Sequence, residues 1–197
     1  MLAWRNAKAS FPWCHLGLVF LGLLFGAHCN ASESFNIRSA STQLVKGVYR
    51  LRAQINYPLS EDVKNAIESG IPLIINQEIE VLRLRQWLWP KTIKRIILRH
   101  QLKYHALSEQ FVLTYLNQGK QRTYPNLSAA IKQLSTIKNC PLITRGELDL
   151  HQNYRIRLRT SLSIKDLPAP MRPLAYLSPQ WYLDSPWFSW LLELPDI

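Results

Sequence analysis

Glycine and cysteine are scarce in this sequence, with seven glycines and three cysteines among 197 residues. The glycines form neither a phosphate-binding loop nor the GxSxG motif that surrounds a hydrolase nucleophile. Cys14 and Cys29 lie in an N-terminal segment that we expect to be removed, so Cys140 remains alone, and an internal disulfide framework is excluded. We interpret Cys140 as a small buried hydrophobic residue; a free thiol or an intermolecular bridge is the alternative.

Residues 1–31 have the pattern of a secretory signal peptide. Arg5 and Lys8 supply positive charge, an apolar run of about ten residues follows, and small residues precede the expected cleavage after Ala31. The apolar run is short for a membrane span of about 20 residues, which favours cleavage over an uncleaved membrane anchor. We therefore expect one domain of ordinary size over residues 32–197.

Acidic residues are also scarce, because 13 Asp and Glu residues stand against 24 Lys and Arg residues, for a formal net charge of +11. Removal of two basic residues with the signal peptide lowers this charge to +9. A basic exported protein is expected to have anionic neighbours, such as lipid headgroups, acidic glycans or an acidic patch on an envelope protein. Nucleic acid suits the charge but not the compartment, so we do not expect it as a partner.

Alternation of apolar and polar residues dominates the domain and predicts β-strands. It is clearest in residues 48–57 and 154–164, whose apolar residues fall in one phase, as in antiparallel strands with one buried face. Residues 95–107 alternate in the same way. Residues 110–125 predict a hairpin with its turn at 117–120, where a glycine can take positive φ.

Residues 71–89 alternate less regularly. Ile75 and Ile79 share one phase, whereas Leu82 and Leu84 take the opposite one. Either a β-bulge shifts the register there, or both faces of the strand are covered.

Two segments have helical spacing instead of alternation. Residues 60–70 begin with Ser60 as the N-cap and end at Gly70. Residues 126–137 place their large apolar residues on one face. We therefore predict a mainly β domain, either an antiparallel β-sandwich or a partly open barrel, with two short helices.

Catalytic and metal-ligating residues have little support. His100, His105 and His151 lack the spacing of a zinc site. Ser108 and Glu109 follow His105 closely, but a catalytic Ser–His–acid set is assembled in space, so sequence proximity is weak evidence. We expect no catalytic residues, no cofactor and no metal.

Arginines recur at strand spacing and form the stronger candidate site. The rows are Arg50 and Arg52; Arg83 and Arg85; Arg95 and Arg99; and Arg155, Arg157 and Arg159. If their strands are neighbours in one sheet, these rows merge into a basic plate that could bind phosphate or carboxylate groups. The alternative is a solvated sheet face, partly neutralised by acids such as Glu78 and Glu80. We interpret those two glutamates as solvated rather than as a catalytic carboxylate pair.

The C-terminal stretch, residues 167–190, combines five prolines with three tryptophans. The prolines exclude a long helix or a central strand, so we expect extended chain with turns, followed by an edge strand over residues 186–194. The aromatic side chains either close one end of the core, which we favour, or form an exposed surface that stacks on sugars or anchors at a membrane interface. We also expect the tryptophans of residues 87–89 to meet this tail. The candidate aromatic residues are Trp87, Trp89, Trp181, Trp187 and Trp190.

Several segments carry a family resemblance. They are GVYRL at Gly47, YPLS at Tyr57, SGIPL at Ser69, EIEVLRLRQWLW, KYHALSEQFVLTYLNQG, LPAPMRPLAYLSPQWYL and SPWFSW. Together they resemble uncharacterised exported proteins of proteobacteria, often labelled proline-rich signal peptide proteins, which carry domain of unknown function 4390. The similarity covers nearly all of residues 32–197. It implies a Gram-negative envelope protein, and because the family has no established activity, it assigns no catalytic role to any residue. It also implies a link to envelope signalling, because the genes of this family tend to neighbour a sensor histidine kinase.

We therefore expect an exported, non-catalytic binding or accessory module in the periplasm or on the periplasmic face of a Gram-negative envelope. The arginine rows and the aromatic residues would be its contact surfaces. The expected partner is an envelope protein or an anionic lipid or glycan, with peripheral membrane contact. One alternative is an envelope hydrolase with a site around His105. Another is a small outer-membrane β-barrel, whose strands also alternate, although the arginine load argues against it.

Overall fold

The structure is a computed structural model that describes residues 34–194. The predicted signal peptide lies outside the described residues. The strands are β1 (Asn36–Val45), β2 (Val48–Asn56), β3 (Leu73–Arg83), β4 (Lys91–His105), β5 (Gln110–Tyr115), β6 (Lys120–Tyr124), β7 (Thr136–Thr144), β8 (Tyr154–Leu162) and β9 (Phe188–Leu191). The α-helices are α2 (Glu61–Glu68), α3 (Leu127–Leu134) and α4 (Arg172–Leu177). No helix among these residues is both long and apolar enough to cross a membrane.

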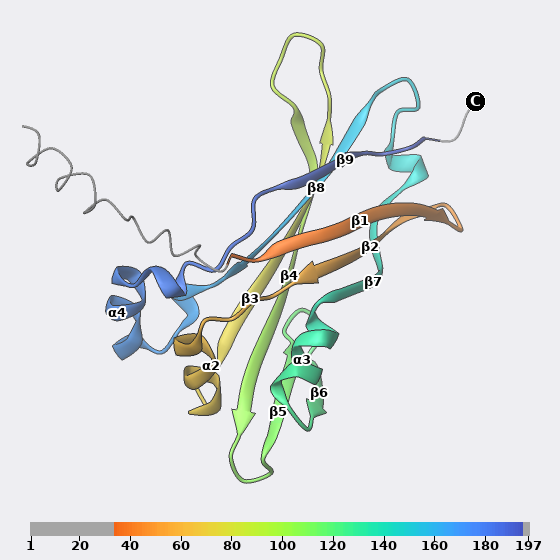
Figure 1. Ribbon diagram of the computed structural model, residues 1–197. Helices are drawn as coiled ribbons and strands as arrows, with labels where there is room; N and C mark the ends of the chain where they lie inside the picture. Colours follow the sequence, from red (N-terminus) through yellow and green to blue (C-terminus); the bar gives the residue numbers. More distant parts are fainter. Residues whose placement is uncertain (1–33, 195–197) are drawn as a thin grey trace, which may run out of the picture. The chain divides into compact units, whose positions relative to one another are not determined.

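The strands form two antiparallel sheets (Figure 1). One sheet has three strands in the order β1-β2-β7, and the other has six in the order β6-β5-β4-β3-β8-β9. The prediction of a mainly antiparallel β domain is confirmed, and the sandwich-like arrangement of two sheets is the one observed.

Both sheets contribute to one hydrophobic core. Its fully buried residues include Leu51 and Ile55 from β2, Ile75 and Ile79 from β3, and Ile156 and Leu158 from β8. Each is in the apolar phase of its strand, and burial of each such side chain stabilises the fold by about 1.5–3 kcal/mol. The alternation of residues 48–57 and 154–164 therefore correctly predicts which side chains of these strands face the core.

A polar network crosses this core. Gln77 is buried, and its Nε2 donates to the Tyr57 hydroxyl at 2.8 Å and to the Leu134 carbonyl oxygen at 3.2 Å. The Tyr57 hydroxyl also lies 3.1 Å from Oγ1 of Thr160. Burial raises the pKa of Tyr57 to about 12. Buried polar groups need hydrogen-bond partners, and here the partners come from β3, β8 and the end of α3. The network therefore links these three elements.

Strand β3 lies between β4 and β8 and is covered on both faces. Its residues are buried without interruption from Gln77 to Leu82. The pairing with β4 also shifts register between Val81 and Leu82. Both explanations for the irregular alternation of residues 71–89 therefore apply.

Two strands, β1 and β7, have no clear alternation in the sequence. The pairing of β1 with β2 shifts register after Ile37. Strand β7 contains Pro141 and has Asn139 at a φ of 59°, and its pairing with β2 shifts register twice. Bulges of this kind break the two-residue period. Ile137, which the sequence suggested as an extension of the second helix, belongs to β7 instead.

Helices α2 and α3 form where they were predicted. Ser60 is the N-cap of α2, but its hydroxyl donates to the Gln180 carbonyl oxygen at 3.2 Å instead of capping the helix. Gly70 follows α2 at a φ of 81°, a conformation that favours glycine. Asn126 caps α3 by accepting a hydrogen bond from the Ala129 N–H at 2.8 Å.

The proline-rich stretch differs from the prediction of extended chain. It contains a third helix, α4, and two 3-10 turns, Ala169–Met171 and Pro179–Trp181. Proline is tolerated in the first turn of a helix, where its missing N–H has no partner to lose, and Pro173 occupies such a position in α4. The predicted edge strand is confirmed, because β9 pairs with β8 at the end of the larger sheet.

Candidate functional site

The arginine rows lie on two different sheets. Arg50 and Arg52 are on β2 in the three-stranded sheet, whereas the other rows lie on β3, β4 and β8 of the six-stranded sheet, except for Arg85 in the loop after β3. One basic plate made of all the rows is therefore not formed. Arg52 is exposed, and Arg50 donates from Nη1 to the Asn139 carbonyl oxygen at 3.3 Å.

Two glutamates and three arginines form a salt-bridge network on the face of the six-stranded sheet that points away from the core. Glu78 and Glu80 are only 8% and 3% exposed. Arg159 donates from Nε to Oε2 of Glu78 at 2.7 Å, and Arg157 does the same to Oε2 of Glu80 at 2.7 Å. Arg95, on the opposite neighbour β4, bridges both glutamates. The interpretation of the glutamates as solvated is wrong, because arginines from both neighbouring strands cover them.

Trp187 covers part of this network. Its ring centroid lies 4.3 Å from the guanidinium carbon of Arg157 and 4.5 Å from that of Arg159, so both cations stack against it. Each of these two arginines is therefore already paired with a glutamate and stacked on an indole ring. Arg155, in the same row, is exposed and lies beside Leu82 at the end of β3.

A further ion pair continues along the same face of the sheet. Arg99 donates from Nη2 to Oδ2 of Asp166 at 2.8 Å, and the Ser163 hydroxyl donates to the same oxygen at 2.7 Å. Burial opposes ionisation of Asp166, but these two hydrogen bonds and the charges of Arg99 and Lys165 together lower the pKa of its carboxyl.

The loop between β3 and β4, residues 84–90, exposes large apolar side chains. Trp87 is 93% exposed, Leu88 64% and Trp89 88%; we call these three residues the tryptophan tip. Arg85 closes the turn, because its Nε and Nη2 donate to the Trp89 carbonyl oxygen at 3.0 and 2.6 Å. In Figure 1 the loop is a free tip at the end of β3 and β4.

Positively charged residues lie at the base of the loop that carries the tryptophan tip. The segment from Arg83 to Lys91 contains three cations and no acid. Arg83 and Lys91 pair in register at the base of the loop, and Arg155 is level with Leu82 on the next strand. Exposed indole rings backed by positive charge suit an interface between water and an anionic surface.

The other candidate tryptophans are not exposed in this way. Trp181 is buried at 5% exposure, Trp187 stacks on arginines, and the Trp190 Nε1 donates to the Thr42 hydroxyl at 2.7 Å. The tryptophans of the tail therefore pack against the domain, as the favoured interpretation had it, whereas Tyr176 and Tyr182 of the same tail are 50% and 49% exposed. The expected meeting of residues 87–89 with the tail is wrong, because both tryptophans there are almost fully exposed.

The His105 and Ser108 side chains do come together. The Ser108 Oγ lies 3.2 Å from Nδ1 of His105 in the turn between β4 and β5. Both residues and Glu109 are exposed, so the pair lies on an open turn rather than in a cleft. Among residues 34–194, no group of three or more His, Cys, Asp or Glu side chains is placed to hold a metal ion.

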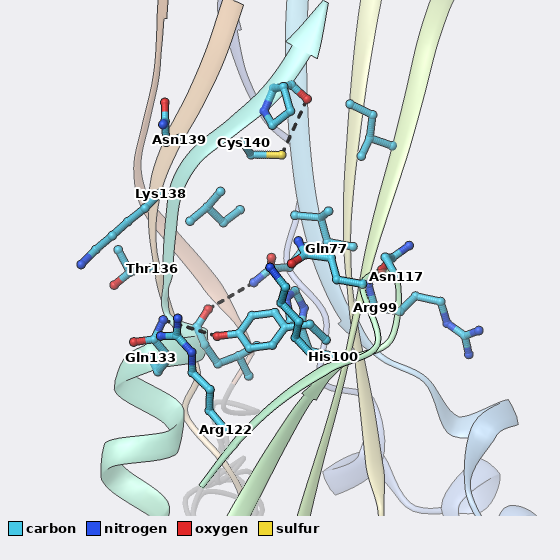
Figure 2. Close-up of a pocket in the computed structure, with 18 residues that line it drawn as sticks. Gln77, Arg99, His100, Asn117, Arg122, Gln133, Thr136, Lys138, Asn139 and Cys140 are labelled. Atoms are coloured by element: carbon cyan, nitrogen blue, oxygen red, sulfur yellow. Dashed lines mark hydrogen bonds between the residues drawn. The ribbon is translucent and has the colours of Figure 1, made fainter. Parts of the chain in front are cut away.

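A cleft with a volume of about 600 Å³ opens between strands β4–β6 and the segment formed by α3 and β7 (Figure 2). Its lining contains no Asp or Glu. Lys120 and Arg122 from β6 lie at its mouth, and Cys140 is half-buried at one side. Burial raises the pKa of the Cys140 thiol, although Arg50 opposes the rise.

His100 is the buried titratable residue of the cleft. The residue is 8% exposed, and its Nδ1 is enclosed without a hydrogen-bond partner among the described residues. Burial lowers the pKa of His100 to about 4, so the ring is neutral at pH 7. It packs edge-on against the Tyr115 ring at 5.2 Å, and the Tyr115 hydroxyl accepts from Nε2 of Gln133 at 3.4 Å.

The sequence interpretation missed this cleft. The available signal was a histidine at position 100 within the apolar phase of residues 95–107, between Leu98 and Leu102. The opposite wall comes from residues 136–144, whose alternation is broken by bulges. No local pattern shows that these two segments face each other.

One of three comparisons with known proteins identifies a family. No curated protein matches the chain, and no solved structure does. The family model described as "Domain of unknown function (DUF4390)" matches residues 32–191. Because this match covers most of the chain, the protein belongs to the DUF4390 family.

Proposed function

We propose that the protein is an exported, non-catalytic binding module of a proteobacterial envelope that docks on an anionic membrane surface through the tryptophan tip. The observation that carries this proposal is the exposure of Trp87 and Trp89, 93% and 88%, on a loop backed by cations. The signal-peptide pattern of residues 1–31 and the excess of basic residues support export to an anionic environment. The resemblance to exported proteins supports an accessory role in envelope signalling.

The tip offers enough apolar area for reversible membrane binding. A tryptophan buries about 150–250 Å² when it is covered, which corresponds to roughly 4–6 kcal/mol at about 25 cal/mol per Å². Insertion to half depth would yield about 2–3 kcal/mol for each ring. Each nearby cation adds about 1 kcal/mol at an anionic surface, and this part is screened by salt.

Vesicle sedimentation tests the proposal. We expect the protein to co-sediment with vesicles that contain phosphatidylglycerol and much less with vesicles of phosphatidylcholine alone. The double variant Trp87→Ala/Trp89→Ala should lose at least tenfold in affinity, since about 2 kcal/mol per ring corresponds to about 30-fold. Raising the salt concentration should weaken the binding of the wild type.

Leu107→Ala is the matched control. Leu107 is 95% exposed in the turn at the other end of β4, so its removal deletes an equally exposed apolar side chain outside the tip. The control should bind vesicles as the wild type does. Equal binding by the tip variant and the control would refute the proposed docking.

A further inference from the structure

The cleft leaves core-facing apolar side chains uncovered. Ile96 and Leu98 lie in the same phase of β4 as Leu102, which is 1% exposed in the core. Both are nevertheless only half-buried, because the cleft opens above them. Apolar surface on the inner side of a sheet is normally covered, so these residues offer a ready contact for an apolar group.

The floor of the cleft carries no net charge. Gln77 and His100 are both buried there, and Gln77 uses its Nε2 for the Tyr57 hydroxyl and the Leu134 carbonyl oxygen. His100 is neutral at pH 7, for the reason given above. Because the floor carries no charge, a hydrocarbon chain that lies against Ile96 and Leu98 removes no ion of the floor from water.

The mouth is cationic. Lys120 and Arg122 line it from β6, and Figure 2 shows Arg122 beside Gln133 on one side of the cleft. Two other lining cations do not contribute, because the side chains of Arg99 and Lys138 point away from the cleft in Figure 2. With no acid in the lining, an anionic group at the mouth meets positive charge without competition.

We propose that this cleft binds an apolar chain that ends in an anionic head, a carboxylate or a phosphate. The chain lies against Ile96 and Leu98, and the head lies between Arg122 and Lys120. A volume of about 600 Å³ is within the range of small-molecule sites. This site is separate from the tryptophan tip and goes beyond the proposed membrane docking, because it takes a single molecule out of water or out of a membrane.

Calorimetric titration with dodecanoate and with dodecyl phosphate, each below its micelle-forming concentration, tests the proposal. We expect the wild type to bind both probes, and a stronger response to one of them identifies a fatty acid or a phosphate headgroup as the source. Dodecyl maltoside, which has the same chain and no charge, should bind at least tenfold more weakly. Equal affinity for the uncharged probe would overturn the assignment of an anionic head.

Two double variants separate the mouth of the cleft from general charge effects. Lys120→Gln/Arg122→Gln should weaken the binding of both anionic probes at least tenfold. Lys103→Gln/Arg38→Gln removes the same two charges from exposed positions outside the lining and should bind as the wild type does. Equal affinities of the two variants would overturn the proposal.

Two further measurements test whether the probe lies on the floor of the cleft and whether cleft binding is independent of the tryptophan tip. The imidazole ¹⁵N resonances of His100, assigned with His100→Gln, should shift on saturation with dodecanoate, whereas unchanged resonances would overturn binding in this cleft. Trp87→Ala/Trp89→Ala should bind dodecanoate as tightly as the wild type. Failure of vesicle docking and failure of the cleft site are thereby distinguished.

Discussion

Replacement of Glu80 by glutamine should destabilise the fold, although Glu80 lies on the side of the sheet that faces away from the core. Its side chain is 4% exposed, it accepts from Nε of Arg157 at 2.7 Å, and it lies 3.0 Å from Nε of Arg95. Removing one partner of a buried ion pair costs about 3–5 kcal/mol. The two arginines are 34% and 55% exposed and can turn toward water, so we expect a smaller loss, of about 2–3 kcal/mol.

Chemical denaturation followed by circular dichroism measures this loss. The midpoint should fall while the slope of the free energy against denaturant stays unchanged, because the variant exposes the same surface on unfolding. In thermal unfolding, a domain of this size loses about 2–4 °C for each kcal/mol. The melting temperature should therefore fall by roughly 4–12 °C.

Glu61→Gln is the matched control. Glu61 also pairs with a cation, Lys64 at 2.7 Å, but its side chain is 79% exposed. Exposed pairs of this kind contribute about 0–1 kcal/mol, so the control should change stability by no more than about 0.5 kcal/mol. If Glu80→Gln costs no more than Glu61→Gln, the network is not structural, and its arginines are free to bind other anions.

Three further changes test the core and the cleft. Burial holds the pKa of His100 at about 4 in the folded state, below the value of about 6.5 in an unfolded chain, so the free energy of unfolding should fall by about 3 kcal/mol as the pH drops from 6.5 to 4. Chemical denaturation at several pH values should show that His100→Gln loses this pH dependence of stability, and an unchanged dependence would contradict a buried neutral ring. Trp181→Ala should lower the free energy of unfolding by about 3–5 kcal/mol, because Trp181 is 5% exposed, whereas Trp87→Ala should change it by no more than about 0.5 kcal/mol. Equal losses would refute the assignment of one ring to the core and the other to the tip. Tyr57→Phe should cost about 1–3 kcal/mol because Thr160 loses its buried partner, and a stability equal to that of the wild type would show that the polar network does not hold the core.

Much of the fold follows from local pattern. Residues 48–57 and 154–164 alternate because each strand buries one face against the core, and each inward position is visible as an apolar residue. The hairpin at 117–120 and the end of α2 at Gly70 are likewise local, since each requires a glycine at positive φ. These features depend on residues within a few positions of one another.

The candidate sites followed the sequence less closely. By their position in the strand pattern, Glu78 and Glu80 look like surface residues. They are buried because arginines distant in the sequence cover them: Arg95 and Arg159, 17 and 81 positions away, pair with Glu78, and Arg157, 77 positions away, pairs with Glu80. Trp181 and Trp89 are the same residue type, yet one lies in the core and the other at a free tip. Composition identified the residues that could form contacts, but not which of them were already engaged.

The sequence by itself determined the strand periods, the helix ends, the family and the basic charge, because these depend on residue type and short spacing. Only the tertiary structure decided which face of β3 receives arginines, which tryptophans remain exposed and where two sheets part to form a cleft. Each of these depends on which strands are neighbours, and strand pairing brings together residues that no local period relates.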